Sequence, residues 1–196
     1  MNKGELRALA VSYLKRSDFS AADFNAWCTF AASRLGRALR AQSNLVAVTL
    51  NAVANPVALP PDYRAMRSVE VGVSNGTFRL SVAEADLNSV PLSSQGGFPY
   101  AYRVEGLNME VRPFSAVPLM VKYWNEPAAL IDDSSTNAVL SAAPQVYLYA
   151  VLIEGAIWAM DAGAASGYVG VFNAEVEQLN LSGSYANAGD TPAMGG

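Results

Sequence analysis

The 196-residue sequence contains no histidine and only one cysteine, Cys28. Without histidine the chain has no Ser-His-Asp or Cys-His nucleophile, and it has no imidazole for acid–base chemistry or metal binding. A single cysteine excludes an internal disulfide and a thiolate metal cluster. Charged residues interrupt the first apolar positions, so we expect no signal peptide and a soluble protein kept in a reducing compartment.

Positive charge is absent from the C-terminal part of the chain. Residues 1–42 contain seven Lys or Arg and three acids, residues 43–122 contain six of each sign, and residues 123–196 contain eight acids alone. The three segments therefore carry net charges of +4, 0 and −8. This asymmetry predicts that the two ends attract each other, within one molecule or between neighbours, unless the charges serve only solubility.

The chain is rich in apolar residues, with 52% hydrophobic, 10% aromatic and 15% charged residues, which excludes a disordered protein. Helical spacing of apolar residues predicts one helix near the N-terminus and a second from a capping box at Ser20 and Asp23 to about Gln42. Three arginines lie on the flanks and back of this second helix: Arg34, Arg37 and Arg40. They either form a solvated face that suits a helix C-terminus, or contact an acidic partner or nucleic acid.

The segment from Leu45 to Trp124 has the composition and spacing of strands. Asn75-Gly76 between two apolar runs predicts a hairpin. Ser81-Val82-Ala83-Glu84 resembles a second capping box and predicts a short helix ending near Asn88. Three further strands are expected to form a meander, at residues 102–105, 109–112 and 119–124. We expect an antiparallel sheet or open barrel of about six strands.

Helical patterning returns after Asn137, and Pro144 suits the first turn of a helix. Residues 146–160 are apolar nearly all round, but this run is too short to span a membrane and contains Glu154. We therefore expect a central bundle helix, with Glu154 paired to an Arg or Tyr of the N-terminal helices. Gly163 is the expected C-cap, and residues 167–181 are expected to form the last helix.

These elements predict an α+β fold that is discontinuous in sequence. Helices from residues 1–43 and 137–182 form one bundle, and residues 44–136 form a β module inserted between the second and third helices. Residues 183–196 are rich in Ser, Gly and Ala, and we expect an extended C-terminal tail there.

A search for catalytic chemistry gives little. The carboxylate pair Asp132-Asp133 stands in a polar segment, where turn formation explains it better than acid–base catalysis. The glycine-rich stretch Gly163–Gly170 lacks the lysine of a phosphate loop. The isoelectric point near 4.8 argues against tight sequence-specific binding of nucleic acid. We expect no enzymatic activity, no metal and no cofactor.

The ordered set of motifs nevertheless resembles phage head–tail connector (adaptor) proteins. The resemblance runs over about residues 20–160, and it is carried by Arg34–Arg40, Leu59–Arg64, Tyr102–Glu105, Met109–Pro113, Trp124–Leu130, Asn137–Leu140 and Pro144–Ala150. The last helix lacks the basic residues that such proteins carry there.

The resemblance implies a structural virion protein, made in the host cytoplasm. Copies would form a ring, commonly of twelve, beneath the portal protein, continuing the DNA channel with non-specific proximity to packaged DNA. The ring would also dock neck or tail proteins. The expected contacts with the portal or a neighbouring subunit are the α-helical arginines and the C-terminal tail, namely Arg34, Arg37, Arg40, Ser184, Tyr185, Asn187, Asp190 and Met194. No membrane contact is implied.

Two other interpretations remain open. The protein could be a different neck or tail component, such as a stopper or tube-initiating protein, which would assemble with sixfold symmetry. Alternatively, the β module could bind sugar or peptide in a pocket lined by residues such as Tyr100, Tyr102 and Trp124. Cross-strand packing would explain the same aromatic residues without a ligand.

Overall fold

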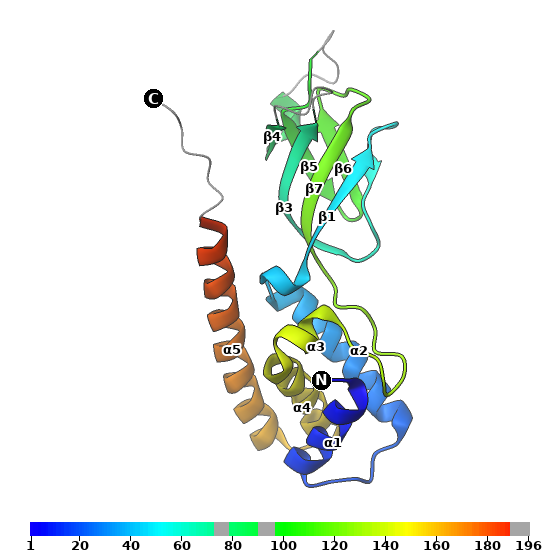
Figure 1. Ribbon diagram of the computed structural model, residues 1–196, viewed down its shortest axis with the longest axis vertical. Coiled ribbons are helices and arrows are strands. Elements are labelled where there is room, and N and C mark those ends of the chain that lie inside the picture. Colours follow the sequence, from blue (N-terminus) through cyan, green and yellow to red (C-terminus); the bar gives the residue numbers. More distant parts are fainter. Residues whose placement is uncertain (73–78, 90–96, 189–196) are drawn as a thin grey trace. The chain divides into compact units, whose positions relative to one another are not determined.

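The structure, a computed structural model, describes residues 1–72, 79–89 and 97–188. Its contacts divide the chain into two units, shown in Figure 1. The helical unit combines Met1–Asn44 with the chain from Glu126 onward, and the β unit comprises Leu45–Asn125. The predicted α+β class, with strands inserted between the second and third helices, is confirmed. The connecting residues 126–136, which we expected in the β module, belong with the helices.

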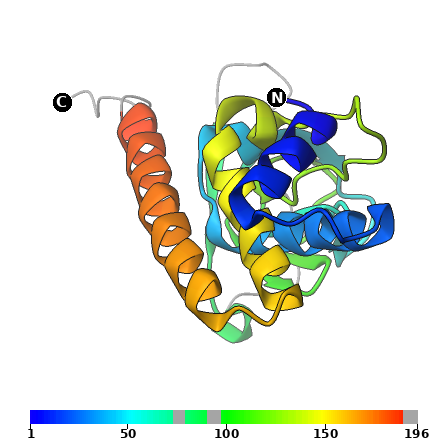
Figure 2. The ribbon, with the colours of Figure 1, turned by 90° about the horizontal axis from the view of Figure 1, so that it is seen from below.

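The helical unit is built around one apolar helix, α4. Its helices are α1 (Lys3–Leu14), α2 (Ala21–Ala38), α3 (Ala138–Ala142), α4 (Pro144–Trp158) and α5 (Ala162–Ala188), with a short 3-10 turn at Gln42–Asn44. Nine of the fifteen residues of α4 are buried, because α1, α2, α3 and α5 all pack against it. Figure 2 shows α5 beside α4 at the edge of this unit. None of the described helices is both long and apolar enough to cross a membrane.

Local sequence signals set most of the helix starts. Ser20 and Asp23 form the predicted capping box of α2, and the Asn137 side chain accepts a hydrogen bond from Leu140 N at the start of α3. Pro144 occupies the first turn of α4, where its missing N–H has no intrahelical partner to lose. The end of α2 differs from the prediction, since the helix stops at Ala38 and Leu39 is extended.

The turn between α4 and α5 also differs from the prediction. Gly163 does not cap α4, because the left-handed position is taken by Met160, at φ 56°. The Asp161 side chain accepts a hydrogen bond from Ala164 N and starts α5 earlier than expected. The helix then continues to Ala188, six residues into the segment that we expected to be extended. Once nucleated, a helix gains one hydrogen bond for each added residue, which favours this extension.

The described part of the β unit contains seven strands. They are β1 (Leu45–Asn51), β2 (Val57–Ala58), β3 (Tyr63–Gly72), β4 (Arg79–Glu84), β5 (Ala101–Glu105), β6 (Asn108–Arg112) and β7 (Pro118–Asn125). Their order is β1-β7-β3-β4-β5-β6-β2. All neighbours are antiparallel except β4 and β5, which are parallel. The predicted meander is therefore wrong in one strand: β7 lies between β1 and β3 and does not pair with β6.

The helix expected from residue 81 to about Asn88 is also wrong in its start and length, because the structure has only a 3-10 turn at Leu87–Ser89. Ser81 to Glu84 belong to β4, where Ala83 and Glu84 pair with Ala101 and Tyr102 of β5. Pairing with a distant strand therefore overrides the local capping pattern. The Asn75-Gly76 turn lies outside the described residues, although β3 and β4 pair antiparallel as a hairpin requires.

One apolar cluster forms the core of the β unit. Side chains alternate along β7, so that Leu119, Val121 and Tyr123 are buried. Met109 and Val111 of β6 join the same cluster although β6 lies four positions away in the sheet. The sheet must therefore curl to bring both ends of the strand order to one core, as the open-barrel prediction requires.

Candidate functional site

The arginines predicted to contact a partner lie around the C-terminal end of α2, in three different environments. Arg37 is exposed, and its guanidinium donates a 3.0 Å hydrogen bond to the Ser33 hydroxyl one turn earlier. Arg34 and Arg40 are partly buried and are engaged within the helical unit. Of the three, Arg37 therefore presents its charge most freely to a partner.

Arg34 pairs with the carboxylate of Glu154 on α4. Its Nη2 and Nε atoms lie 2.5 and 3.2 Å from Glu154 Oε1. The Glu154 side chain is 13% exposed and that of Arg34 is 32% exposed, so water screens the pair only in part. This contact confirms the prediction that an arginine or tyrosine of the N-terminal helices partners Glu154. It joins α2 to α4 as a structural ion pair.

The Asn180 side chain of α5 caps the end of α2. Its Oδ1 accepts a 2.6 Å hydrogen bond from the backbone N–H of Arg40, and its Nδ2 donates a 3.0 Å hydrogen bond to the carbonyl of Ala38. The Arg40 guanidinium donates to the Leu39 carbonyl at 2.9 Å. The carbonyls of Ala38 and Leu39 are groups that a helix C-terminus leaves without intrahelical partners, and the N–H of Arg40 lies just beyond the helix. Sequence reasoning missed Asn180, because its partners lie about 140 residues away.

We expect Asn180→Ala to lower the free energy of unfolding of the helical unit by about 1–2 kcal/mol, since two part-buried backbone groups lose their partners. Hydrogen exchange should also become faster in the C-terminal half of α5. Asn173→Ala is the matched control, because Asn173 is an exposed asparagine of the same helix. Equal effects of the two substitutions, measured by urea denaturation and hydrogen exchange, would contradict this role of Asn180.

The predicted C-terminal contact residues are divided between α5 and the chain beyond it. Ser184, Tyr185 and Asn187 lie in the last turns of α5, within a helix and not in an extended tail. Asp190 and Met194 lie outside the described residues. The hydrogen bonds of Asn180 place the C-terminal part of α5 next to the end of α2. The contacts expected of the tail residues stay a prediction.

Two exposed apolar features in the helical unit were not predicted as functional. Phe30 on α2 is 57% exposed and lies off the apolar stripe that α2 buries. The sequence signal for Phe30 is the presence of an aromatic residue outside the apolar stripe of its helix. At the turn between α4 and α5, Met160 is 93% exposed and adjoins a shallow pocket of about 330 Å³ that Ile157 also lines.

The three aromatic residues named for a sugar or peptide pocket lie in different environments. Tyr102 is buried in the β core, and burial raises the pKa of its hydroxyl to about 12. Tyr100 is half exposed, and the Trp124 ring lies under the Arg67 guanidinium at 5.9 Å. Cross-strand packing therefore accounts for Tyr102, the central member of the proposed sugar or peptide pocket.

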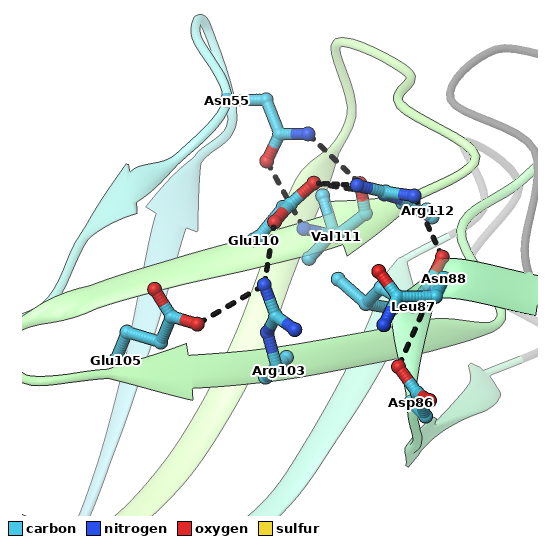
Figure 3. Close-up of polar contacts among 9 residues, drawn as sticks. All are labelled: Asn55, Asp86, Leu87, Asn88, Arg103, Glu105, Glu110, Val111 and Arg112. Carbon is cyan, nitrogen blue, oxygen red and sulfur yellow. Dashed lines mark hydrogen bonds and ion pairs between the residues drawn. The ribbon is translucent and has the colours of Figure 1, made fainter.

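A charged network covers the β5–β6 hairpin, as Figure 3 shows. Arg103 of β5 lies opposite Glu110 of β6 and contacts both Glu105, at 3.0 Å, and Glu110, at 3.7 Å. Arg112 contacts Glu110 at 2.7 Å and donates a hydrogen bond to the carbonyl of Leu87. Charges of opposite sign alternate here at short range. The network therefore holds the hairpin against the preceding loop and offers no field of one sign to a ligand.

The candidate catalytic groups have structural surroundings. Asp132 accepts hydrogen bonds from the hydroxyl groups of Ser134 and Ser135, which lower the pKa of its carboxyl. This is the predicted turn, and its Asp133 carbonyl accepts a hydrogen bond from Gly4 N at the start of α1. Burial raises the pKa of the Cys28 thiol to about 11, which keeps the thiol protonated at neutral pH.

Comparison with known families agrees with the resemblance noted in the sequence. The chain matches the family described as SU10 adaptor protein over residues 1–193. No curated protein matches the chain. The family match includes both units and all five helices described above. The chain therefore belongs to the SU10 adaptor protein family, a family of phage adaptor proteins.

Proposed function

We propose that this phage adaptor protein is a virion component that forms a ring between head and tail. The ring, with twelve subunits expected, binds the portal protein on one side and neck or tail proteins on the other. The observation that carries the proposal is the family match over nearly the whole chain. Membership in an adaptor family supports a structural role and assigns no catalytic one.

The charge distribution supports self-assembly in such a ring. The first 42 residues carry +4 and the last 74 carry −8. Surfaces of opposite sign on one chain favour a head-to-tail contact, and such a contact closes into a ring when the rotation between subunits allows it. We also propose that the α2 arginines and the end of α5 take part in contacts with the portal or with a neighbouring subunit.

An acidic C-terminal segment suits a channel through which DNA passes. Carboxylates repel phosphate groups, so a DNA duplex in a channel lined by them is not bound tightly to the wall. The absence of Lys and Arg after Lys122 fits this role better than it fits tight binding of nucleic acid.

Native mass spectrometry of the full chain, alone and mixed with the portal protein of the same phage, tests the proposed function. We expect the portal to capture a ring of adaptor subunits. A sixfold assembly would indicate a stopper or tube-initiating component instead. A chain that neither self-associates nor binds the portal would contradict the proposal.

A further inference from the structure

The outer face of α5 is uncovered within the described part of the chain. This 27-residue helix packs mainly against α4, through Phe172 and Val176, and is tied to α2 by Asn180. Its opposite face is exposed. The exposed residues along that face include Gly163, Gly167, Gly170, Val171, Ala174 and Glu177.

Two glycines on this face are in close contact with no other described part of the chain. A Cβ atom placed on Gly167 or Gly170 would meet no atom of residues 1–72, 79–89 or 97–188 within 4 Å. Glycine is the poorest helix former after proline, so the helix loses stability at these positions without any internal compensation. Their absent side chains leave a smooth strip of backbone that a bulky side chain from another helix can approach closely.

The outer face of α2 has complementary properties. Phe30 is a large apolar side chain that is more than half exposed, and Ala26, one turn earlier, is also exposed. Arg37 follows Phe30 by seven residues. Within the described part of the chain, its guanidinium contacts the Ser33 hydroxyl and makes no ion pair.

The spacing on the two helices matches. Phe30 and Arg37 are separated by seven residues, as are Gly170 and Glu177, and seven helical residues span about 10.5 Å. A parallel alignment of the two faces therefore places Phe30 over Gly170 when Arg37 lies beside Glu177. Glu177 is exposed, and both charged residues of α5 are acidic, whereas the N-terminal segment that contains α2 is basic.

We propose that α5 of one subunit docks on the outer face of α2 of a second copy of this chain. Phe30 packs on the glycine strip at Gly167 and Gly170, and Arg37 pairs with Glu177 of the neighbour. The contact is heterologous, since each subunit offers α2 to one neighbour and α5 to the other. This proposal rests on the proposed ring-forming function and names the surfaces that would build the ring.

Charge reversal in two separate chains tests the contact. Arg37→Glu alone opposes Glu177, and Glu177→Arg alone opposes Arg37, so each variant should weaken self-association or ring formation on the portal by about tenfold per contact. In an equal mixture every contact between unlike subunits is again complementary. The introduced glutamate of one chain meets the introduced arginine of the other, and the unaltered Arg37 meets the unaltered Glu177. We therefore expect the mixture to restore assembly to the level of the unaltered chain, measured by native mass spectrometry.

Cysteine pairing provides a second readout that does not depend on a stable ring. Phe30→Cys and Gly170→Cys chains are mixed at high concentration under oxidising conditions, and the buried Cys28 stays out of reach of the reaction. We expect disulfide-linked dimers to form faster in this mixture than with either variant alone. Val53→Cys mixed with Gly170→Cys is the control, because Val53 is a highly exposed residue of the β unit.

The outcomes separate this interface from the proposed function. If the unaltered chain forms rings but charge reversal has no effect and cross-linking equals the control, the α2–α5 contact is wrong and the adaptor function stands. If combining both reversals in one chain restores assembly but mixing the two single variants does not, Arg37 and Glu177 interact within one chain. If the unaltered chain forms no assembly with or without the portal, the proposed function and the interface both fail.

Discussion

Gly155→Val is expected to lower the free energy of unfolding of the helical unit by about 3 kcal/mol, through overpacking of the contact among α1, α2 and α4. A Cβ atom at this position would lie 2.7 Å from Cδ1 of Leu14 and 3.2 Å from Cζ3 of the Trp27 ring. The leucine methyl can rotate away, but the tryptophan ring is buried and packs against Phe19, Phe24 and Trp158. Valine adds two further methyl groups to this closed space.

Gly167→Val is the matched control for this substitution. It replaces a helical glycine by the same residue at a position where an added Cβ meets no atom of the described residues within 4 Å. Because valine is a better helix former than glycine, we expect this variant to unfold at the same urea concentration as the unaltered chain or slightly above it. Far-UV circular dichroism follows the transition, and similar midpoints for the two variants would show that Gly155 is not a packing requirement.

Arg34→Met is expected to lower the free energy of unfolding by about 2 kcal/mol, because it leaves the Glu154 carboxylate poorly solvated and without its partner. Fully buried pairs lose more when one partner is removed, but the one-third exposure of Arg34 admits water to this one. Adding Glu154→Leu to Arg34→Met should recover most of the loss, since two apolar side chains of similar length can fill the same space.

Arg37→Met provides the control for Arg34→Met. It removes the same charge from an exposed position one turn away, so we expect a change within about 0.5 kcal/mol. Urea denaturation of the three variants at low protein concentration, where neighbours do not contribute, measures the difference. If the double substitution is as unstable as Arg34→Met alone, packing of the arginine stem and not the ion pair accounts for the loss.

The sequence was sufficient for the elements whose signals are local or periodic. The capping box at Ser20 and the proline at the first turn of α4 were predicted from a few neighbouring residues. Residues 146–160 are apolar nearly all round, which predicted a helix covered on all sides. The Glu154 carboxylate within this helix predicted a side-chain partner from another helix. These inferences needed no knowledge of which helix lies next to which.

Features that depend on pairing between strands far apart in the sequence could not be predicted. Residues 81–84 match a capping box, but the strand pairing of Glu84 with Tyr102 depends on a segment almost twenty residues later. The place of β7 between β1 and β3 is likewise a matter of long-range register. Among the candidate contact residues, the sequence identified Arg37, but it did not separate this exposed arginine from Arg34, which Glu154 occupies. The sequence analysis also did not identify Phe30, because this residue lies outside the apolar stripe of α2.

The discontinuity of the helical unit has a consequence for synthesis on the ribosome. The β unit is one continuous stretch, Leu45–Asn125, so all of its strands have been made once β7 is complete. By contrast α1 and α2, which are made before α4, pack against it, and the Arg34–Glu154 pair joins residues that are 120 positions apart. The apolar faces of α1 and α2 therefore remain uncovered by α4 while more than a hundred further residues are added. Nascent chains stopped before Pro144 should consequently be the ones that chaperones retain and proteases remove.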